Sequence, residues 1–170
     1  SSDVCSSDLT PTQGISLSST GLENALIDSL IPLSRIVTPN IYEASVLTKT
    51  PLAKTTEEMV VQGKILLNYG AKAVLVTGGD LSGPPVDVLI EKGKTQNFIG
   101  ERVNTRHTHG TGCALSSAIA CHLAKGAELA DAINLAKHWL SSALCAADGL
   151  KLTQGRGPPN HLFERSEEHT

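Results

Sequence analysis

The sequence has few aromatic residues and no long apolar run. Aromatic side chains make up 3% of its 170 residues, too few for the stacking platforms that bind single-stranded nucleic acid. A transmembrane helix needs about 18 or more consecutive apolar residues, and none occurs, so we expect no membrane partner. The net charge is −3. Because nucleic-acid-binding proteins usually carry a basic stripe, we expect no nucleic-acid partner either.

The cysteines are also too sparse for a disulfide framework. Four are present, none in a C-x-x-C pair, which favours a reducing, cytoplasmic location. Cys121 and Cys145 fall in apolar helical patterns, and we expect them to be small core residues. His107, His109 and Cys113 lack a second Cys/His pair at ligand spacing, so zinc is not expected.

Both ends differ in composition from the middle. Residues 1–10 and 164–170 are mainly polar and show no hydrophobic period. We expect both segments to be non-native or disordered extensions, which leaves residues 11–163 as the folded part. Ordinary frayed termini are the alternative.

Predicted helices and strands alternate along the body of the chain. Helical periods or caps predict helices over residues 21–33, 41–47, 56–68, 112–125 and 129–144. Short apolar or alternating runs predict strands over residues 35–38, 73–76, 86–91 and 95–99, the last two as a hairpin. This order predicts an α/β fold.

The sharpest motif is Thr108-His109-Gly110-Thr111-Gly112-Cys113, at the start of a predicted helix. Glycines let backbone amides approach an anion, and the first amides of a helix lack internal partners. Gly110, Thr111 and Gly112 could therefore hold developing phosphate charge. Cys113 lies where the helix field favours a thiolate, so it could take a proton from a substrate hydroxyl. The alternative is an ordinary turn with an inert, buried thiol.

Asn40-Ile41-Tyr42-Glu43 is the second motif. The Glu43 carboxylate could orient water on Mg²⁺ beside the phosphate oxygens of a nucleotide. Equally, Asn40 and Glu43 have the spacing of a helix-capping pair.

The third motif, Val76-Thr77-Gly78-Gly79, follows a predicted buried strand. Ligands bind at the carboxyl ends of strands in open α/β sheets, so Thr77 and Gly79 could contact a ligand. A plain turn at the end of the strand is the alternative.

Taken in order, the motifs resemble one family. The strings that carry the resemblance are Thr38-Pro39-Asn40 with Glu43-Ala44, Val76-Thr77-Gly78-Gly79, Thr108-His109-Gly110-Thr111-Gly112-Cys113, Trp139-Leu140-Ser141-Ser142-Ala143-Leu144 and Gly155-Arg156-Gly157-Pro158. The chain resembles the hydroxymethylpyrimidine/phosphomethylpyrimidine kinases of thiamine biosynthesis, over residues 11–163. These enzymes belong to the ribokinase-like superfamily. The resemblance therefore implies the carboxyl-terminal part of a three-layer α/β/α sandwich.

The resemblance also implies an activity and roles for residues. The reaction is ATP-dependent phosphorylation of hydroxymethylpyrimidine and then of its monophosphate, with Mg²⁺ as the metal. By position, Gly110, Thr111 and Gly112 form the anion hole and Cys113 is the base. Asn40, Glu43, Thr77 and Gly79 lie on the nucleotide side, with Glu43 near Mg²⁺ through water. The full-length protein could form a homodimer.

Three departures from the family pattern affect function. Many members carry Lys where this chain has Thr77, which removes one positive charge opposite the phosphates, and many carry Asn in place of His107. The family's amino-terminal half, with most of the pyrimidine pocket, is absent, so we expect this chain alone to be weakly active or inactive. The alternatives are a pyridoxal-type kinase, a non-catalytic module that senses a pyrimidine or nucleotide, and a degenerate fragment without activity.

Overall fold

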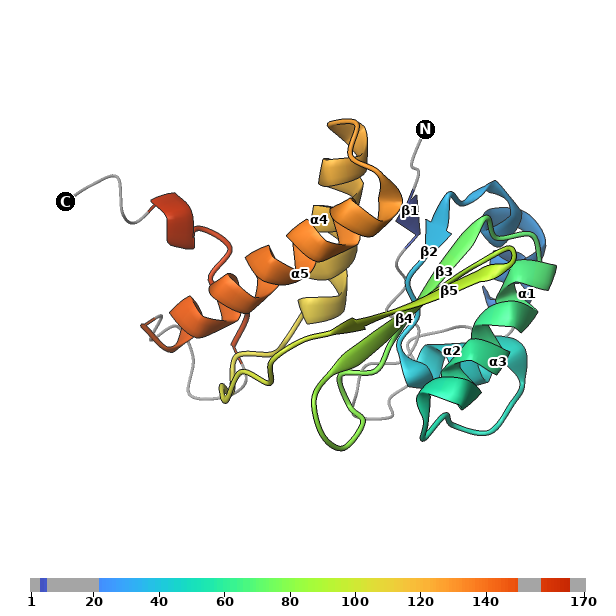
Figure 1. The fold of residues 1–170 in the computed structure, drawn as a ribbon, viewed down its shortest axis with the longest axis horizontal. Coiled ribbons are helices and arrows are strands. Elements are labelled where there is room, and N and C mark those ends of the chain that lie inside the picture. The colour runs from blue at the N-terminus through green and yellow to red at the C-terminus, as the bar shows by residue number, and fades with distance from the viewer. Residues whose placement is uncertain (1–3, 6–21, 150–156, 166–170) are drawn as a thin grey trace. The chain divides into compact units, whose positions relative to one another are not determined.

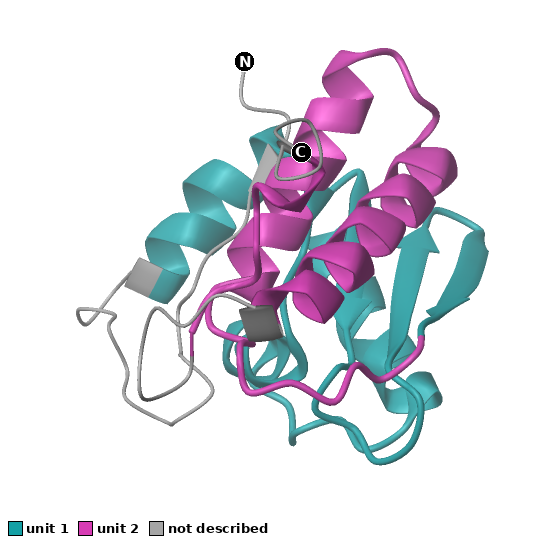
Figure 2. Cartoon of the chain, turned by 90° about the vertical axis from the view of Figure 1, so that its left-hand side faces the viewer, with its two compact units in different colours: residues 1–100 teal, residues 101–170 magenta. Residues whose placement is uncertain are grey.

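The computed structural model describes residues 4–5, 22–149 and 157–165. The chain divides into two compact units, residues 1–100 and residues 101–170, which Figure 2 draws in different colours. The first unit is an α/β sheet with helices, and the second is helical. Each unit is considered by itself below.

The first unit contains a mixed sheet, with five strands among the described residues (Figure 1). In spatial order these are β1 (Val4–Cys5), β2 (Ile36–Val37), β3 (Ala73–Thr77), β4 (Val86–Glu91) and β5 (Lys94–Ile99). The β1–β2 and β2–β3 pairs are parallel, whereas β3–β4 and β4–β5 are antiparallel. The carboxyl ends of β2 and β3 therefore meet at the same edge of the sheet.

Helices cover one face of this sheet. They are α1 (Leu22–Ala25), a π-helical turn (Leu26–Leu30), a 3₁₀ turn (Ile31–Leu33), α2 (Ile41–Thr48) and α3 (Thr56–Asn68). Side chains alternate along a strand, so Val74 and Val76 of β3 share a face with Val88 of β4. These valines form one buried core with Met59 and Leu66 of α3. The core holds the sheet against its helices. It thereby also fixes the carboxyl ends of β2 and β3, which carry two of the predicted motifs.

Most predicted elements of the first unit are confirmed, and the differences have local causes. The hairpin lies where it is predicted, with Gly93 in the left-handed region at φ +78° in its tight turn. The first predicted helix changes to π and 3₁₀ turns near Pro32, which has no N–H to continue an α-helical ladder. At the start of α3, Thr55 Oγ1 accepts from the Glu58 amide and the Glu58 carboxylate accepts from the Lys54 amide, so only the Thr55 half of a capping box is present.

The second unit contains α4 (Thr111–Ala124) and α5 (Leu129–Cys145), which pack against each other. A 3₁₀ turn (Ala146–Gly149) follows α5, and another (Phe163–Arg165) lies near the carboxyl end. The buried residues of α4 are Ala114, Leu115, Ser116, Ile119 and Leu123, and those of α5 are Ala132, Ile133, Ala136 and Ala143. Both predicted helices are thus confirmed.

The prediction that Cys121 and Cys145 are core residues is wrong. Both are exposed. Each lies two residues after a buried position, Ile119 on α4 and Ala143 on α5. Two residues correspond to about 200° around a helix, so both thiols point away from the buried face.

The two terminal segments are described only in part. Val4–Cys5 form β1, within the segment that the composition sets apart from the fold. The rest of residues 1–10, and residues 166–170, lie outside the described residues, so their assignment stays a prediction. Within the described ranges, no helix is both long enough and apolar enough to cross a membrane.

Candidate active site

Asn40 and Glu43 form a reciprocal cap on α2. The Asn40 side-chain oxygen accepts from the amides of Tyr42 and Glu43, both at 2.9 Å, and Glu43 Oε2 accepts from the Asn40 amide at 2.9 Å. Glu43 is buried, with 3% of its surface exposed. The capping interpretation of the sequence is therefore correct. The same bonds hold the carboxylate rigidly where β2 passes into α2.

Thr77 lies directly beside this cap. The Thr77 amide donates to the Pro39 carbonyl at 2.9 Å, and Asn40 and Thr77 form an isolated parallel bridge. The second and third motifs thus meet at the carboxyl ends of two adjacent parallel strands, which is where ligands bind in open α/β sheets. Gly79 is exposed, and a side chain at that position would meet no atom within 4 Å.

Asp87 is a residue of this edge that the sequence analysis missed. It lies on β4 opposite Thr77, is 5% exposed, and accepts a hydrogen bond from the Gly78 amide at 3.1 Å. A side chain at Gly78 would approach the Val86 carbonyl oxygen within 2.4 Å. Asp87 therefore positions the turn that carries Thr77 and Gly79. The available signal was an acidic residue inside the otherwise apolar run of residues 86–90.

The glycine-rich turn of the second unit leads directly into α4. Gly110 is the residue that caps the helix, at φ +77° in the left-handed region, and its carbonyl accepts from the Ala114 amide at 3.0 Å. Thr111, Gly112 and Cys113 are the first three residues of α4, so their amides lie at the positive end of the helix dipole. Cys113 is exposed, so the burial of the thiol in the alternative interpretation is wrong, whereas an ordinary turn stays an alternative.

In the structure, the predicted site residues fall into two spatial groups, one in each unit. Asn40, Glu43, Thr77 and Gly79 lie together at one sheet edge of the first unit. Gly110, Thr111, Gly112 and Cys113 lie together at the start of α4 in the second unit. The structure brings the members of each group together, whereas a single site built from both groups stays a prediction.

The donor set around Glu43 limits how Mg²⁺ could be held. Among residues 4–5, 22–149 and 157–165, no three His, Cys, Asp or Glu side chains are placed to hold a metal ion together. Mg²⁺ in phosphate-transfer sites commonly keeps several waters and takes only one or two carboxylates besides substrate phosphates. A single buried carboxylate that acts through water fits this pattern.

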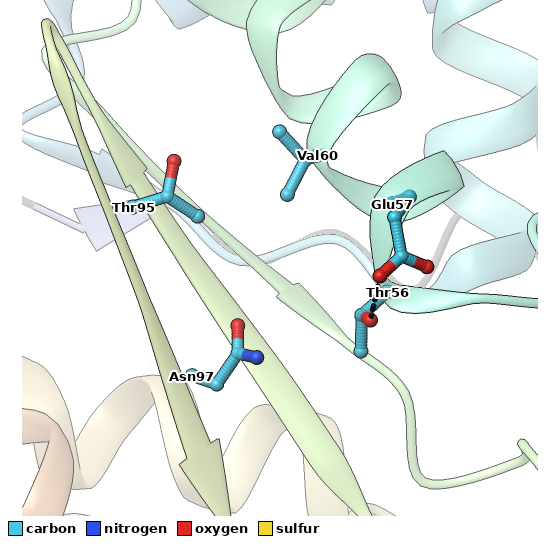
Figure 3. A pocket seen from close by; sticks show the side chains of 5 residues that line it. All are labelled: Thr56, Glu57, Val60, Thr95 and Asn97. Carbon is cyan, nitrogen blue, oxygen red and sulfur yellow. Dashed lines mark hydrogen bonds between the residues drawn. The ribbon is translucent and has the colours of Figure 1, made fainter.

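A groove elsewhere in the first unit is not part of this arrangement. It encloses about 350 Å³ and is lined by Thr56, Glu57, Val60, Thr95 and Asn97 (Figure 3). A backbone hydrogen bond, with side-chain hydrogen bonds from Thr55 and Thr56, lowers the pKa of Glu57. A negative charge at this position disfavours phosphate groups. None of the predicted site residues lines the groove.

Comparison with known proteins gives a consistent result. The profile of the phosphomethylpyrimidine kinase family matches residues 3–160. The hydroxymethylpyrimidine/phosphomethylpyrimidine kinase of Rhizobium meliloti is 45% identical over 139 residues, which cover 81% of this chain and 52% of the relative. The enzyme of the same name from Escherichia coli is 42% identical over 134 residues, which cover 78% and 50%.

Solved structures show the same similarity. An ADP complex of Bacillus subtilis pyridoxal kinase is 36% identical with a TM-score of 0.78, covering 84% of this chain and 54% of that chain. The phosphomethylpyrimidine kinase of Clostridium difficile is 36% identical with a TM-score of 0.67, covering 78% and 53%.

These alignments confirm the predicted fold class, an α/β fold of the ribokinase-like type. The chain belongs to the phosphomethylpyrimidine kinase family. It spans about half the length of the curated relatives that it matches.

Proposed function

We propose that this chain carries the phosphoryl-transfer part of an ATP-dependent kinase that acts on hydroxymethylpyrimidine and its monophosphate in thiamine biosynthesis. Membership in the family and the names of the relatives support the reaction class. The observation that carries the proposal is the start of α4, where the left-handed Gly110 leads into the first helical turn beside an exposed cysteine.

The proposed chemistry at α4 uses backbone and side chain together. Cys113 Sγ, as thiolate, takes the proton of the substrate hydroxyl, and the hydroxyl oxygen attacks the γ-phosphorus of ATP. The bond between that phosphorus and the oxygen of ADP breaks, so the products are the phosphorylated pyrimidine and ADP. The amides of Thr111, Gly112 and Cys113 stabilise the negative charge of the phosphoryl oxygens during transfer.

The sheet edge of the first unit supplies the nucleotide side in this proposal. The turn at Thr77 and Gly79 contacts the phosphates, and the Asp87 hydrogen bond to Gly78 keeps that turn in place. Glu43 would hold Mg²⁺ through a water, and the ion would supply neutralisation of phosphate charge. Thr77 contributes a hydroxyl but no positive charge here.

A pyridoxal-type kinase is the second candidate function. The pyridoxal kinase of Bacillus subtilis shares 36% identity with this chain, as much as the phosphomethylpyrimidine kinase of Clostridium difficile does. Two extended proteins separate the two candidates, one joining this chain to the amino-terminal half of the Rhizobium meliloti relative and the other to that of the Bacillus subtilis pyridoxal kinase. Each is incubated with ATP, Mg²⁺ and its matching acceptor, and this chain should complete an active enzyme only with the half of its own class. A sensing module would bind a ligand and give neither product.

The purified 170-residue chain shows whether this part of the kinase binds ATP or transfers phosphate by itself. We expect ATP binding in calorimetry but little or no phosphorylation of hydroxymethylpyrimidine, because transfer needs both substrates held in line and most acceptor contacts are expected outside this chain. Robust phosphorylation by this chain would overturn that expectation.

The role of Cys113 is tested in an extended protein, made by joining this chain to the amino-terminal half of the Rhizobium meliloti relative. Loss of a general base lowers turnover by roughly 10²- to 10⁴-fold, so Cys113→Ala should lose turnover and keep its affinity for ATP. Cys121→Ala is the matched control, since it removes an exposed thiol from the same helix. Unchanged turnover in Cys113→Ala would contradict the proposed base.

A further inference from the structure

A short segment of the second unit, residues 157–161, connects α5 to the glycine-rich turn. At one end, the His109 amide donates to the Gly157 carbonyl at 3.1 Å. At the other end, the Asn160 amide donates to the Ala143 carbonyl of α5 at 2.9 Å, and the His161 ring stacks on Trp139 with centroids 5.9 Å apart. The segment is thus fastened at both ends.

Gly157 contacts the chain just before the glycine-rich turn. It is buried, and a Cβ built on it would lie 2.3 Å from Nδ1 and 3.1 Å from Cε1 of His107. The close approach of the His107 ring is therefore a reason for glycine at this position.

The bond to His109 acts on the start of α4. His109 directly precedes Gly110, the residue that caps the helix, and Gly110 has the φ of +77° that turns the chain into α4. Fixing the His109 amide fixes how the chain enters this turn, and hence where the amides of Thr111 and Gly112 point. Because α5 packs on α4 and also anchors residues 157–161, the turn is held from both of its sides.

We propose that Gly157 is a positioning residue for the anion-binding turn, which it holds through its carbonyl and through the space it leaves for His107. This inference rests on the proposed function, because it assigns the turn to a migrating phosphoryl group. Gly157 itself touches no substrate in this account.

Hydrogen exchange of the 170-residue chain tests the positioning directly. Gly157→Ala should raise the exchange rates of the amides at residues 109–113 by about tenfold or more relative to the unchanged chain. In the double variant Gly157→Ala with His107→Ala, the new methyl group has room and the carbonyl of residue 157 can again accept from His109. The double variant should restore slow exchange. Unchanged exchange in Gly157→Ala, or no recovery in the double variant, would overturn the inference.

Kinetics of the extended protein separate this inference from the proposed function. Gly157→Ala should lower kcat by about tenfold or more while the KM for ATP changes less than about threefold, as expected when transition-state contacts are lost. The His107→Ala change should rescue kcat in the double variant. Altered exchange with unaltered kcat would overturn the positioning role. Absence of kinase activity in every version, with the predicted exchange pattern present, would instead count against the proposed function alone.

A second variant covers the case in which Gly157→Ala does not fold. Trp139→Leu removes the ring that stacks on His161 and loosens only the α5 end of the segment. It should raise exchange at residues 109–113 by a smaller factor. If Trp139→Leu leaves the exchange rates of these amides unchanged, α5 does not hold the turn through residues 157–161.

Discussion

Gly78 and Asp87 are joined across two adjacent strands by a hydrogen bond of 3.1 Å from the glycine amide to the carboxyl oxygen Oδ1. The bond lies next to the Thr77–Asp87 pair of the β3–β4 ladder. Both Gly78 and Asp87 are buried, so water cannot readily replace the acceptor if it is removed. The turn that carries Thr77 and Gly79 therefore depends on a residue eight positions beyond Gly79.

Substitutions of Asp87 should separate the effect of its hydrogen bond to the Gly78 amide from the effect of its negative charge. Asp87→Ala leaves the buried Gly78 amide without this acceptor, so the free energy of unfolding should fall by about 1–3 kcal/mol. ATP affinity should fall with it, because Thr77 and Gly79 lose their support. Urea denaturation and calorimetry of the 170-residue chain measure the two effects.

Asp87→Asn is the control for this experiment. Asparagine keeps a side-chain oxygen of the same shape that can accept from Gly78. It should retain most of the stability and the ATP affinity. Equal losses in Asp87→Ala and Asp87→Asn would show that the hydrogen bond is not what holds the turn.

Gly110 and Gly126 form a matched pair of variants that tests the proposed anion-binding turn. They flank α4, have φ values of +77° and +87°, and each has open space where a Cβ would lie. Alanine at either position costs roughly 1–2 kcal/mol in the left-handed region. Both variants should therefore lose similar stability in urea denaturation.

Only Gly110→Ala should also impair phosphoryl transfer. The strained residue would relax toward negative φ and redirect the amides of Thr111 and Gly112. In the extended protein, kcat should fall for Gly110→Ala and stay near its original value for Gly126→Ala. Equal turnover in the two variants would argue against a role for the turn.

Glu57 gives a prediction about pH. Its backbone and side-chain hydrogen bonds lower its pKa below the ordinary value of 4.5. A lowered pKa in the folded state means that the ionised carboxylate stabilises the fold at pH values above 4.5. That contribution is lost as the pH falls through the lowered pKa. The Tm difference between the original chain and Glu57→Gln should therefore be largest near neutral pH and shrink in acid.

Thr56→Val is the companion variant for this test. It removes the hydroxyl that donates to Glu57 Oε1 at 3.2 Å with little change in shape. The pKa of Glu57, followed by NMR titration, should move back toward 4.5. A Tm difference that does not depend on pH would contradict the assignment.

Local signals in the sequence predicted most elements correctly. Asn40 and Glu43 have the spacing of a capping box, and the structure contains that box at the start of α2. Lys92 and Gly93 separate two strand-forming runs, and β4 and β5 pair there as a hairpin. These features depend on residues within a few positions of one another, so composition and spacing suffice to find them.

Features that depend on distant residues were not predicted. Cys121 and Cys145 match an apolar helical pattern, but which face of α4 or α5 is buried is decided by how those helices pack. Asp87 and Gly157 act on turns that are distant in the sequence, Gly78 and His109. No local pattern links such pairs.

The sequence alone determined the family, the order of helices and strands, and the glycine turn with its cysteine at the start of α4. Each of these depends on short, contiguous sequence motifs. The tertiary structure decided which distant residues hold these motifs in position. Thr77 meets Asn40 because β2 and β3 are neighbours in the sheet, and His109 meets Gly157 because α5 anchors the segment that carries it. Hydrogen bonds and close packing act between neighbours in space, and only the folded chain defines those neighbours.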